Sequence, residues 1–167
     1  SKIYMFDKNM GFTLASSLRK TTNGGLNWVD FSSGGIATDI KFIDTLVGWK
    51  TYDGIKKTTD GGSNWFSQQL PNYSSSFTNG CISIINRDTV WMVGAEKYKR
   101  APVYKTTNGG LNWGYQIPDT TVQIYAYNFC IFINKKYGWL SPFSTKFQVH
   151  TTTGGNEITY FTGIRHI

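Results

Sequence analysis

The stretch KTTNGGLNW at residues 20–28 recurs as KTTDGGSNW at residues 57–65 and as KTTNGGLNW at residues 105–113. A degenerate fourth copy, HTTTGGNEI, follows at residues 150–158. The first threonines of the four copies are Thr21, Thr58, Thr106 and Thr151, so consecutive copies begin 37, 48 and 45 residues apart. Self-similarity at such a spacing indicates one supersecondary unit that is repeated and stacked against its neighbours.

Each copy has the residues of a tight turn between two strands. Asn23, Asp60 and Asn108 carry short side chains that accept backbone N–H bonds, and the glycine pair that follows adopts positive φ without steric cost. The hydroxyl of the first threonine can bond the same turn. We expect the tryptophan that closes each intact copy to begin the outgoing strand and to bury its ring in the core, rather than to form a ligand platform.

The repeat length predicts the fold, because roughly 40–50 residues make one four-stranded propeller blade. The 167 residues hold four such units in a single repeat domain, at approximately 1–35, 36–76, 77–120 and 121–167. Aromatic residues at 16%, with 18 glycines and only four prolines, fit short strands joined by tight turns. We therefore predict an all-β fold of four propeller-type blades, each of four antiparallel strands, which either closes as a small ring or forms part of a larger one.

With these motifs the chain resembles the Asp-box, or BNR, repeat family, whose pattern is Ser/Thr-x-Asp-x-Gly-x-Thr-Trp. Sialidases, sortilin-type receptors, xyloglucan-degrading glycosidases and photosystem II assembly-factor-like propellers carry this repeat. A second recurring pattern, FID then GW at residues 42–49 and FIN then GW at residues 132–139, makes the assembly-factor-like branch the closest likeness. Asparagine replaces aspartate in two copies, and the fourth copy keeps little of the motif. The resemblance implies a structural role for the matching residues, which are Thr21, Asn23, Gly25, Trp28, Thr58, Asp60, Gly62, Trp65, Thr106, Asn108, Gly110, Trp113, Thr151 and Gly155.

The formal charge of +7 does not lead us to expect a nucleic-acid partner, because the basic residues are scattered along the chain. Lys20, Lys57 and Lys105 each precede a motif copy, and we interpret them as solvated residues that block edge-to-edge strand pairing. Cys81 and Cys130 fall in equivalent strands of neighbouring blades, where buried free thiols fit better than a disulfide. No apolar run approaches the roughly 18 residues of a membrane span.

The candidate binding surface is one face of the repeat. If the strands of a blade are named A to D, the A–B and C–D turns emerge on one face, and the D–A and B–C loops emerge on the other, where propellers bind their ligands. The turns that contain Asp7, Asp44 and Asp88 then lie on the first face as turn formers. The D–A and B–C loops supply the candidate contacts to a protein or a glycan, which are Tyr52, Asp53, Tyr73, Phe77, Glu96, Tyr98 and Asp119.

Catalytic constellations are not apparent in the sequence. A sialidase needs three converging arginines, and the four in this chain are scattered. A glycosidase needs two carboxylates that face each other across a cleft. His150 and His166 have no partner at metal-ligand spacing, so we expect neither a metal nor a cofactor. The sequence favours a non-catalytic interaction module, extracellular or periplasmic, that self-associates if its blades do not close; the alternative is a fragment of a propeller glycoside hydrolase.

Overall fold

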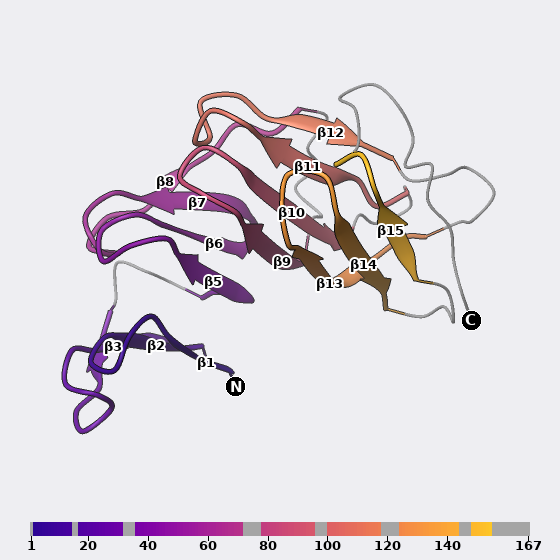
Figure 1. Ribbon diagram of the computed structural model, residues 1–167. Helices are drawn as coiled ribbons and strands as arrows, with labels where there is room; N and C mark the ends of the chain where they lie inside the picture. Colours follow the sequence, from indigo (N-terminus) through magenta and orange to yellow (C-terminus); the bar gives the residue numbers. More distant parts are fainter. Residues whose placement is uncertain are drawn as a thin grey trace.

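The computed structural model describes residues 2–14, 17–31, 36–71, 78–95, 100–117, 124–143 and 148–154. Every regular element within these residues is a β-strand, and the strands form four separate antiparallel sheets in chain order. The all-β prediction of four propeller-type blades is confirmed. We call the sheets blades 1 to 4, and Figure 1 shows them following one another from the N-terminal to the C-terminal part of the chain.

The strands of each blade pair in the order of the sequence. Blade 1 contains β1 (Lys2–Met5), β2 (Gly11–Leu14), β3 (Leu18–Thr21) and β4 (Val29–Asp30). Blade 2 contains β5 (Asp39–Phe42), β6 (Gly48–Tyr52), β7 (Gly54–Thr58) and β8 (Phe66–Ser67). Blade 3 contains β9 (Thr78–Ile84), β10 (Val90–Ala95), β11 (Val103–Thr106) and β12 (Gly114–Gln116). The described part of blade 4 contains β13 (Tyr127–Phe132), β14 (Gly138–Pro142) and β15 (Val149–Thr151). The expected last strand, at residues 158–161, lies outside the described residues.

Hydrogen bonds within the motif copies fix the turn between the third and fourth strands. The Thr58 hydroxyl oxygen accepts from the Gly62 N–H at 2.9 Å, and Asp60 Oδ1 accepts from the Asn64 N–H at 2.9 Å. The first and third copies repeat both bonds with asparagine in the place of Asp60, because only the side-chain oxygen is needed. Gly61 and Gly62 have φ of 71° and 92°, where a side chain would be strained. The outgoing strand begins one residue after the tryptophan rather than at it.

A second turn, between the first and second strands, is held in the same way in all four blades. The side-chain oxygen of one residue accepts from the backbone N–H groups two and three residues later, at 2.7 to 3.1 Å. The accepting residues are Asp7, Asp44, Asn86 and Asn134. In blade 3 the turn former is therefore Asn86 and not Asp88, because an amide oxygen at the first position accepts both bonds.

Neighbouring blades pack through one recurring aromatic contact. The second strand of a blade presents a large ring, and the first strand of the next blade covers it. Phe12 is stacked on Phe42 with the ring centroids 4.8 Å apart, and Trp91 is stacked on Phe132 at 4.0 Å. Trp49 lies in the core cluster against which Ile84 of blade 3 packs. Phe12, Trp49 and Trp91 are each 0% exposed as a result.

The lysines that precede the motif copies also join the blades, which corrects their interpretation as solvated edge residues. Lys20 Nζ donates to the Gly61 carbonyl of the next blade at 2.8 Å, and Lys57 Nζ donates to the Gly109 carbonyl at 2.7 Å. The Lys57 ammonium lies 5.2 Å from the centroid of the Trp49 ring in its own blade, a favourable cation–π distance. Burial lowers the pKa of both ammonium groups, although neither lysine is fully enclosed.

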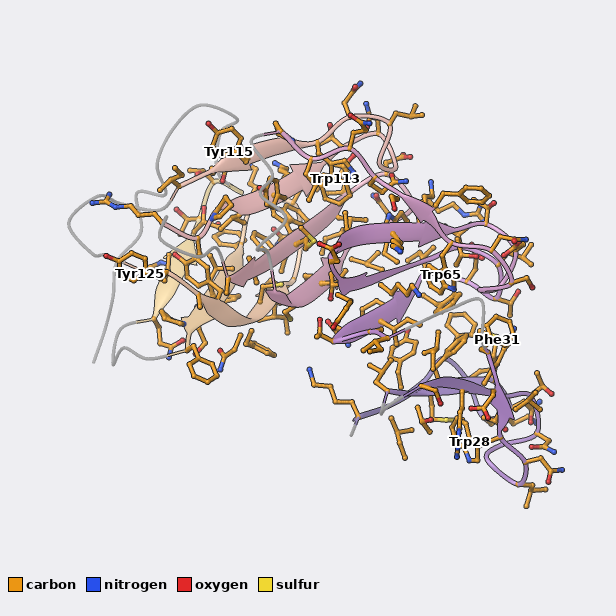
Figure 2. All side chains as sticks on the ribbon, turned by 180° about the vertical axis from the view of Figure 1, so that it is seen from behind. Trp28, Phe31, Trp65, Trp113, Tyr115 and Tyr125 are labelled. Carbon is orange, nitrogen blue, oxygen red and sulfur yellow. The ribbon has the colours of Figure 1, made fainter. Side chains whose placement is uncertain are left out.

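The motif tryptophans are buried to different extents because each one faces the preceding blade. Trp113 belongs to the core cluster of Trp49 in blade 2, and Trp65 packs against the cluster that contains Phe12 of blade 1. Trp28 is half-buried, and no preceding blade lies beside it among the described residues. Figure 2 shows Trp65 and Phe31 at the junction of blades 1 and 2, with Trp28 farther out.

A groove between the first strands of the four blades

The first strands of the four blades, β1, β5, β9 and β13, line a common groove. Its volume is about 600 Å³, and consecutive residues of these strands line it, such as residues 81–84 of β9 and 128–132 of β13. Phe42, Ile84 and Phe132, which cover a ring of the preceding blade, are among the lining residues. The groove is therefore a product of the blade stacking and belongs to no single repeat.

Lysines and apolar side chains give the groove its chemical character. Lys2 and Lys41 supply two ammonium groups, while Ile3, Phe129 and Ile131 supply exposed apolar surface. Lys41 Nζ lies 5.2 Å from the centroid of the Tyr4 ring, which holds the lysine against the wall. Asp39 is the carboxylate among the described lining residues, and its Oδ2 accepts from the Ile82 N–H of blade 3 at 2.9 Å in a buried position.

The remaining polar groups of the wall fasten one blade to the next. The Tyr4 hydroxyl both donates to the Phe42 carbonyl and accepts from the Phe42 N–H, each at 3.1 Å. Ser83 Oγ accepts from the Phe132 N–H at 2.9 Å at the equivalent place between blades 3 and 4. Burial raises the pKa of the Tyr4 hydroxyl, so this group stays neutral at physiological pH.

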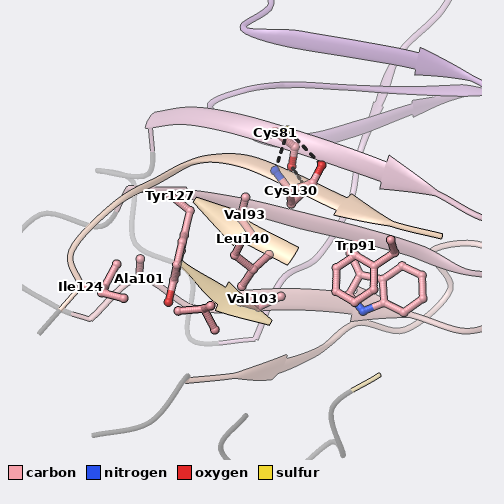
Figure 3. Packing of buried hydrophobic residues seen from close by; sticks show 11 residues of the cluster. Cys81, Trp91, Val93, Ala101, Val103, Ile124, Tyr127, Cys130 and Leu140 are labelled. Carbon is pink, nitrogen blue, oxygen red and sulfur yellow. Dashed lines mark hydrogen bonds between the residues drawn. The ribbon is translucent and has the colours of Figure 1, made fainter. Parts of the chain in front are cut away.

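Cys81 and Cys130 lie side by side in the wall, as Figure 3 shows. Both thiols are free and buried. Cys81 Sγ accepts from the Cys130 N–H at 3.3 Å, and the Cys130 thiol donates to the Cys81 carbonyl at 3.4 Å. Burial raises the pKa of Cys130 well above its ordinary value, which keeps this thiol protonated and unreactive.

A second hollow of about 380 Å³ shares Lys2, Leu14 and Asn128 with the groove and adjoins it on the side of the D–A and B–C loops; we call this hollow the groove mouth. Lys2, Asn128 and Phe143 line this mouth, and the Phe143 ring is exposed. On the blade 2 side, the hydroxyls of Thr38 and Thr51 both donate to the Gly80 carbonyl, at 3.2 and 3.0 Å. These bonds hold blade 2 against β9 at the rim, so the mouth has a fixed edge.

The structure brings few of the sequence-predicted contact residues to this site. Tyr52 and Asp53 form the exposed turn between β6 and β7, on the expected face but outside both hollows. Tyr73, Phe77, Glu96, Tyr98 and Asp119 lie outside the described residues, as does Gly155 of the fourth motif copy. Sequence reasoning missed Lys2, Lys41 and Asn128, because they lie within strands and only the stacking of four blades brings them together.

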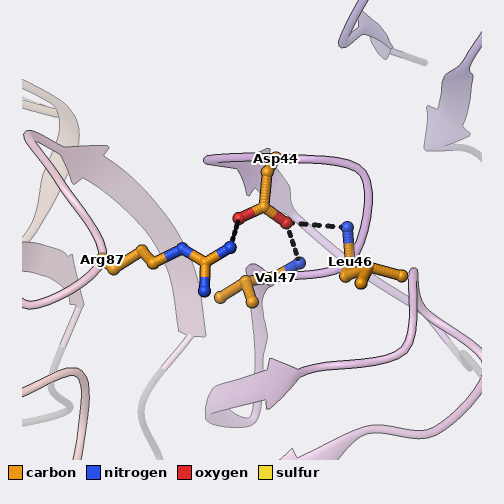
Figure 4. A network of polar contacts seen from close by, with 4 residues as sticks. All are labelled: Asp44, Leu46, Val47 and Arg87. Atoms are coloured by element: carbon orange, nitrogen blue, oxygen red, sulfur yellow. Dashed lines mark hydrogen bonds and ion pairs between the residues drawn. The ribbon is translucent and has the colours of Figure 1, made fainter.

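The opposite face carries the A–B turns, and its charges join neighbouring turns. Asp44 accepts from the backbone N–H groups of Leu46 and Val47 and also pairs with Arg87 of the blade 3 turn (Figure 4). Burial raises the pKa of the Asp44 carboxyl, but the hydrogen bonds from Val47 and Leu46 and the charge of Arg87 together outweigh it and hold the pKa below its ordinary range. This carboxylate is engaged in structural contacts and is not among the residues that line the groove.

Within the described ranges no three His, Cys, Asp or Glu side chains gather in a way that could hold a metal ion. No helix long and apolar enough to cross a membrane occurs in the same part of the chain.

Four antiparallel sheets stacked with their first strands around a shared groove are the blades of a β-propeller. Solved structures support this class. The chain superimposes on YCF48 bound to a D1 peptide with a TM-score of 0.59 and 21% identity, over 71% of this chain and 36% of that one. For YCF48 from Cyanidioschyzon merolae the TM-score is 0.67 and the identity 16%, over 99% of this chain and 55% of that one. For a GH74 enzyme of Niastella koreensis the TM-score is 0.69 and the identity 21%, over 94% of this chain and 28% of that one.

At these identities the likeness concerns the fold. The chain spans at most about half the length of the three structures. No model of a known protein family matches the sequence, and no curated protein matches it either.

Proposed function

We propose that the protein is a non-catalytic interaction scaffold of the Asp-box repeat type, and that it binds an extended protein segment at the groove mouth on the D–A and B–C loop face. The observation that carries the proposal is the lining of the groove and its mouth. Two lysines lie among exposed apolar side chains, and the carboxylate beside them already accepts a backbone bond. The similarity to YCF48, which has been solved with a D1 peptide, favours a protein partner.

The lining defines the chemistry of the bound segment. Apolar side chains of a ligand fit against Ile3, Phe129 and Phe143, while a carboxylate suits Lys2 and Lys41. We therefore propose an extended segment with at least one apolar residue next to an acidic residue or a free C-terminus. Tyr52 and Asp53 would extend the contact over the rim, together with the candidate residues of the undescribed loops.

A glycoside hydrolase fragment is the second candidate function, because the GH74 enzymes share the fold. Hydrolysis needs an acid and a second carboxylate across a cleft. Asp39 stands alone among the described lining residues, and its hydrogen bond to Ile82 fixes it in the wall. This arrangement supports the scaffold over the enzyme.

A displayed random-peptide library and a glycan array, both probed with the purified chain, test the proposal. Selected peptides are expected to be apolar and acidic, and Lys41→Glu should weaken their binding at least tenfold by fluorescence anisotropy. Lys8→Glu is the matched control, since Lys8 is an exposed lysine of the opposite face. Equal weakening by both variants, or selection of glycans alone, would contradict a peptide groove. Release of sugar from xyloglucan, lost in Asp53→Asn, would establish the enzyme instead.

A further inference from the structure

The contact between consecutive blades is built from two equivalent positions. One is the ring of the second strand, at Phe12, Trp49 and Trp91, and the other is the covering residue of the next blade's first strand, at Phe42, Ile84 and Phe132. The strand pairings establish the equivalence, because each covering residue lies opposite the first residue of its own second strand. In blades 2 and 4 that first residue is a glycine, and the covering ring lies directly over it.

The ring position occurs once more in blade 4 and the covering position once more in blade 1, and in these two outer blades both residues are uncovered. Trp139 of blade 4 stands where Trp49 and Trp91 stand, yet it is 40% exposed while they are 0% exposed. Met5 of blade 1 stands where Phe42 and Phe132 stand, and it is 41% exposed. Met5 also lies over its own glycine, Gly11, so it has the orientation of a covering residue with nothing to cover.

The neighbours of Trp139 and of Met5 are also apolar and exposed. Around Trp139, the exposed side chains are Phe129, Ile131 and Ile133. Beside Met5, Ile3 is 68% exposed, whereas Ile40 and Ile82 at the equivalent positions are at most 1% exposed. Blades 1 and 4 lie at opposite ends of the arc in Figure 1, so these two faces do not cover each other within one chain.

We propose that the two faces form a head-to-tail contact between copies of this chain, in which Trp139 of one copy is covered by Met5 of a second copy. Inside the chain, each such ring is covered by the first strand of another blade. Among the described residues, β1 of blade 1 is the first strand whose covering residue has no ring to cover, so blade 1 of a second copy is the partner that we propose for Trp139. A thioether against an aromatic ring is a favourable pair, and both faces are apolar. The contact is heterologous, so it generates rings if the rotation closes and open chains if it does not.

This contact adjoins the proposed peptide site, because Ile3, Phe129 and Ile131 also line the groove, but Met5 and Trp139 line neither the groove nor its mouth. Changes at Met5 and Trp139 should therefore abolish self-association and leave peptide binding unchanged, so the two proposals can fail separately.

Light scattering coupled to size-exclusion chromatography, at a series of protein concentrations, tests the proposal. The chain should pass from 18.8 kDa to multiples of that mass as its concentration rises. Met5→Lys and Trp139→Lys should each remain monomeric over the same range. Leu111→Lys is the control, because Leu111 is an exposed leucine of a motif turn outside both faces and its loss should leave the association unchanged.

Mixing the two variants gives the sharper result. The Met5→Lys chain keeps an intact Trp139 face, and the Trp139→Lys chain keeps an intact Met5 face, so an equal mixture should form a dimer of twice 18.8 kDa and nothing larger. The variants should melt within a few degrees of the unchanged chain, because both positions are partly exposed. A chain that stays monomeric at every concentration overturns the proposal and leaves the faces to another occupant. Association that survives Trp139→Lys, or a mixture that stays monomeric, overturns it as well.

Discussion

Replacement of Lys50 by methionine should stabilise the fold. Lys50 lies in β6 on the side of blade 2 that faces blade 1, and it is only 3% exposed. Its Nζ lies 4.9 Å from the centroid of the Trp65 ring. At the equivalent positions, blade 3 carries Met92 and blade 4 carries Leu140, both buried. Methionine is therefore expected to fit at position 50 without a change in the packing of the blade.

The pKa of Lys50 gives the magnitude. Burial lowers the pKa from its ordinary value of 10.5 to about 8, and the nearby Lys56 lowers it further in the same direction. A fall of this size corresponds to about 3 kcal/mol of folding free energy lost at neutral pH, where the lysine must be charged. The cation–π contact with Trp65 offsets about 1–2 kcal/mol of this loss. Methionine should therefore raise the free energy of unfolding at pH 7 by about 1–2 kcal/mol.

The sign of the pH dependence provides the check. The folded pKa of Lys50 is lowered, so between pH 8 and pH 10.5 the unfolded chain binds more protons and the stability of the unchanged protein rises with pH. Below pH 8 the full loss is present. The advantage of Lys50→Met should thus be largest at pH 7 and shrink towards zero near pH 10.5, since other titrating groups cancel in the comparison.

Urea denaturation followed by tryptophan fluorescence at pH 7 and pH 10 measures both effects. Lys8→Met, at an exposed lysine of an A–B turn, is the control and should change little at either pH. A less stable Lys50→Met protein at pH 7 would refute the reasoning. An advantage that is the same at both pH values would refute it too, because the gain would then come from packing and not from the removed charge.

Three further predictions concern the contacts between blades and the turns. Trp91→Ala should lower the free energy of unfolding by about 3–5 kcal/mol in urea denaturation, whereas Trp139→Ala, at the uncovered equivalent position, should cost less than half as much. The Asp60 carboxyl should titrate at about pH 2 in a carbon-detected NMR titration, chiefly because it accepts the Asn64 N–H, and its contribution to stability should be lost only as the pH falls from 3.8 towards 2. A thiol reagent should modify Cys130 in denaturant but not in the folded protein at pH 8, and rapid modification of the native chain would contradict the burial of this thiol.

The sequence was sufficient for the fold because the information is local. Within each motif copy, Thr58 and Asp60 or their equivalents bond backbone groups no more than four residues away. Such bonds depend on residue type and short spacing alone, so four copies predict four hairpins and the spacing between them predicts the blade.

The contacts between blades could not be predicted in the same way. The carbonyl that accepts from Lys20 belongs to Gly61, 41 residues later, and the one that accepts from Lys57 belongs to Gly109, 52 residues later. Nothing in the local pattern distinguishes such a lysine from a solvated one. The groove has the same origin, since Lys2, Asp39 and Phe129 come from three different blades.

The lysine that reaches from one blade into the turn of the next couples each repeat only to its nearest neighbours. The stability of the array is then approximately a sum of the stabilities of single blades and of the contacts between adjacent blades. A blade enclosed on both sides loses two such couplings when it opens, and a blade at the edge of the array loses one. Where Lys20, Lys57 and Lys105 stand in the first three blades, blade 4 has His150. Amide hydrogen exchange should therefore be slowest in β6 and β10 and fastest in β2 and β14, so that the chain frays inward from its outer blades rather than opening at its centre.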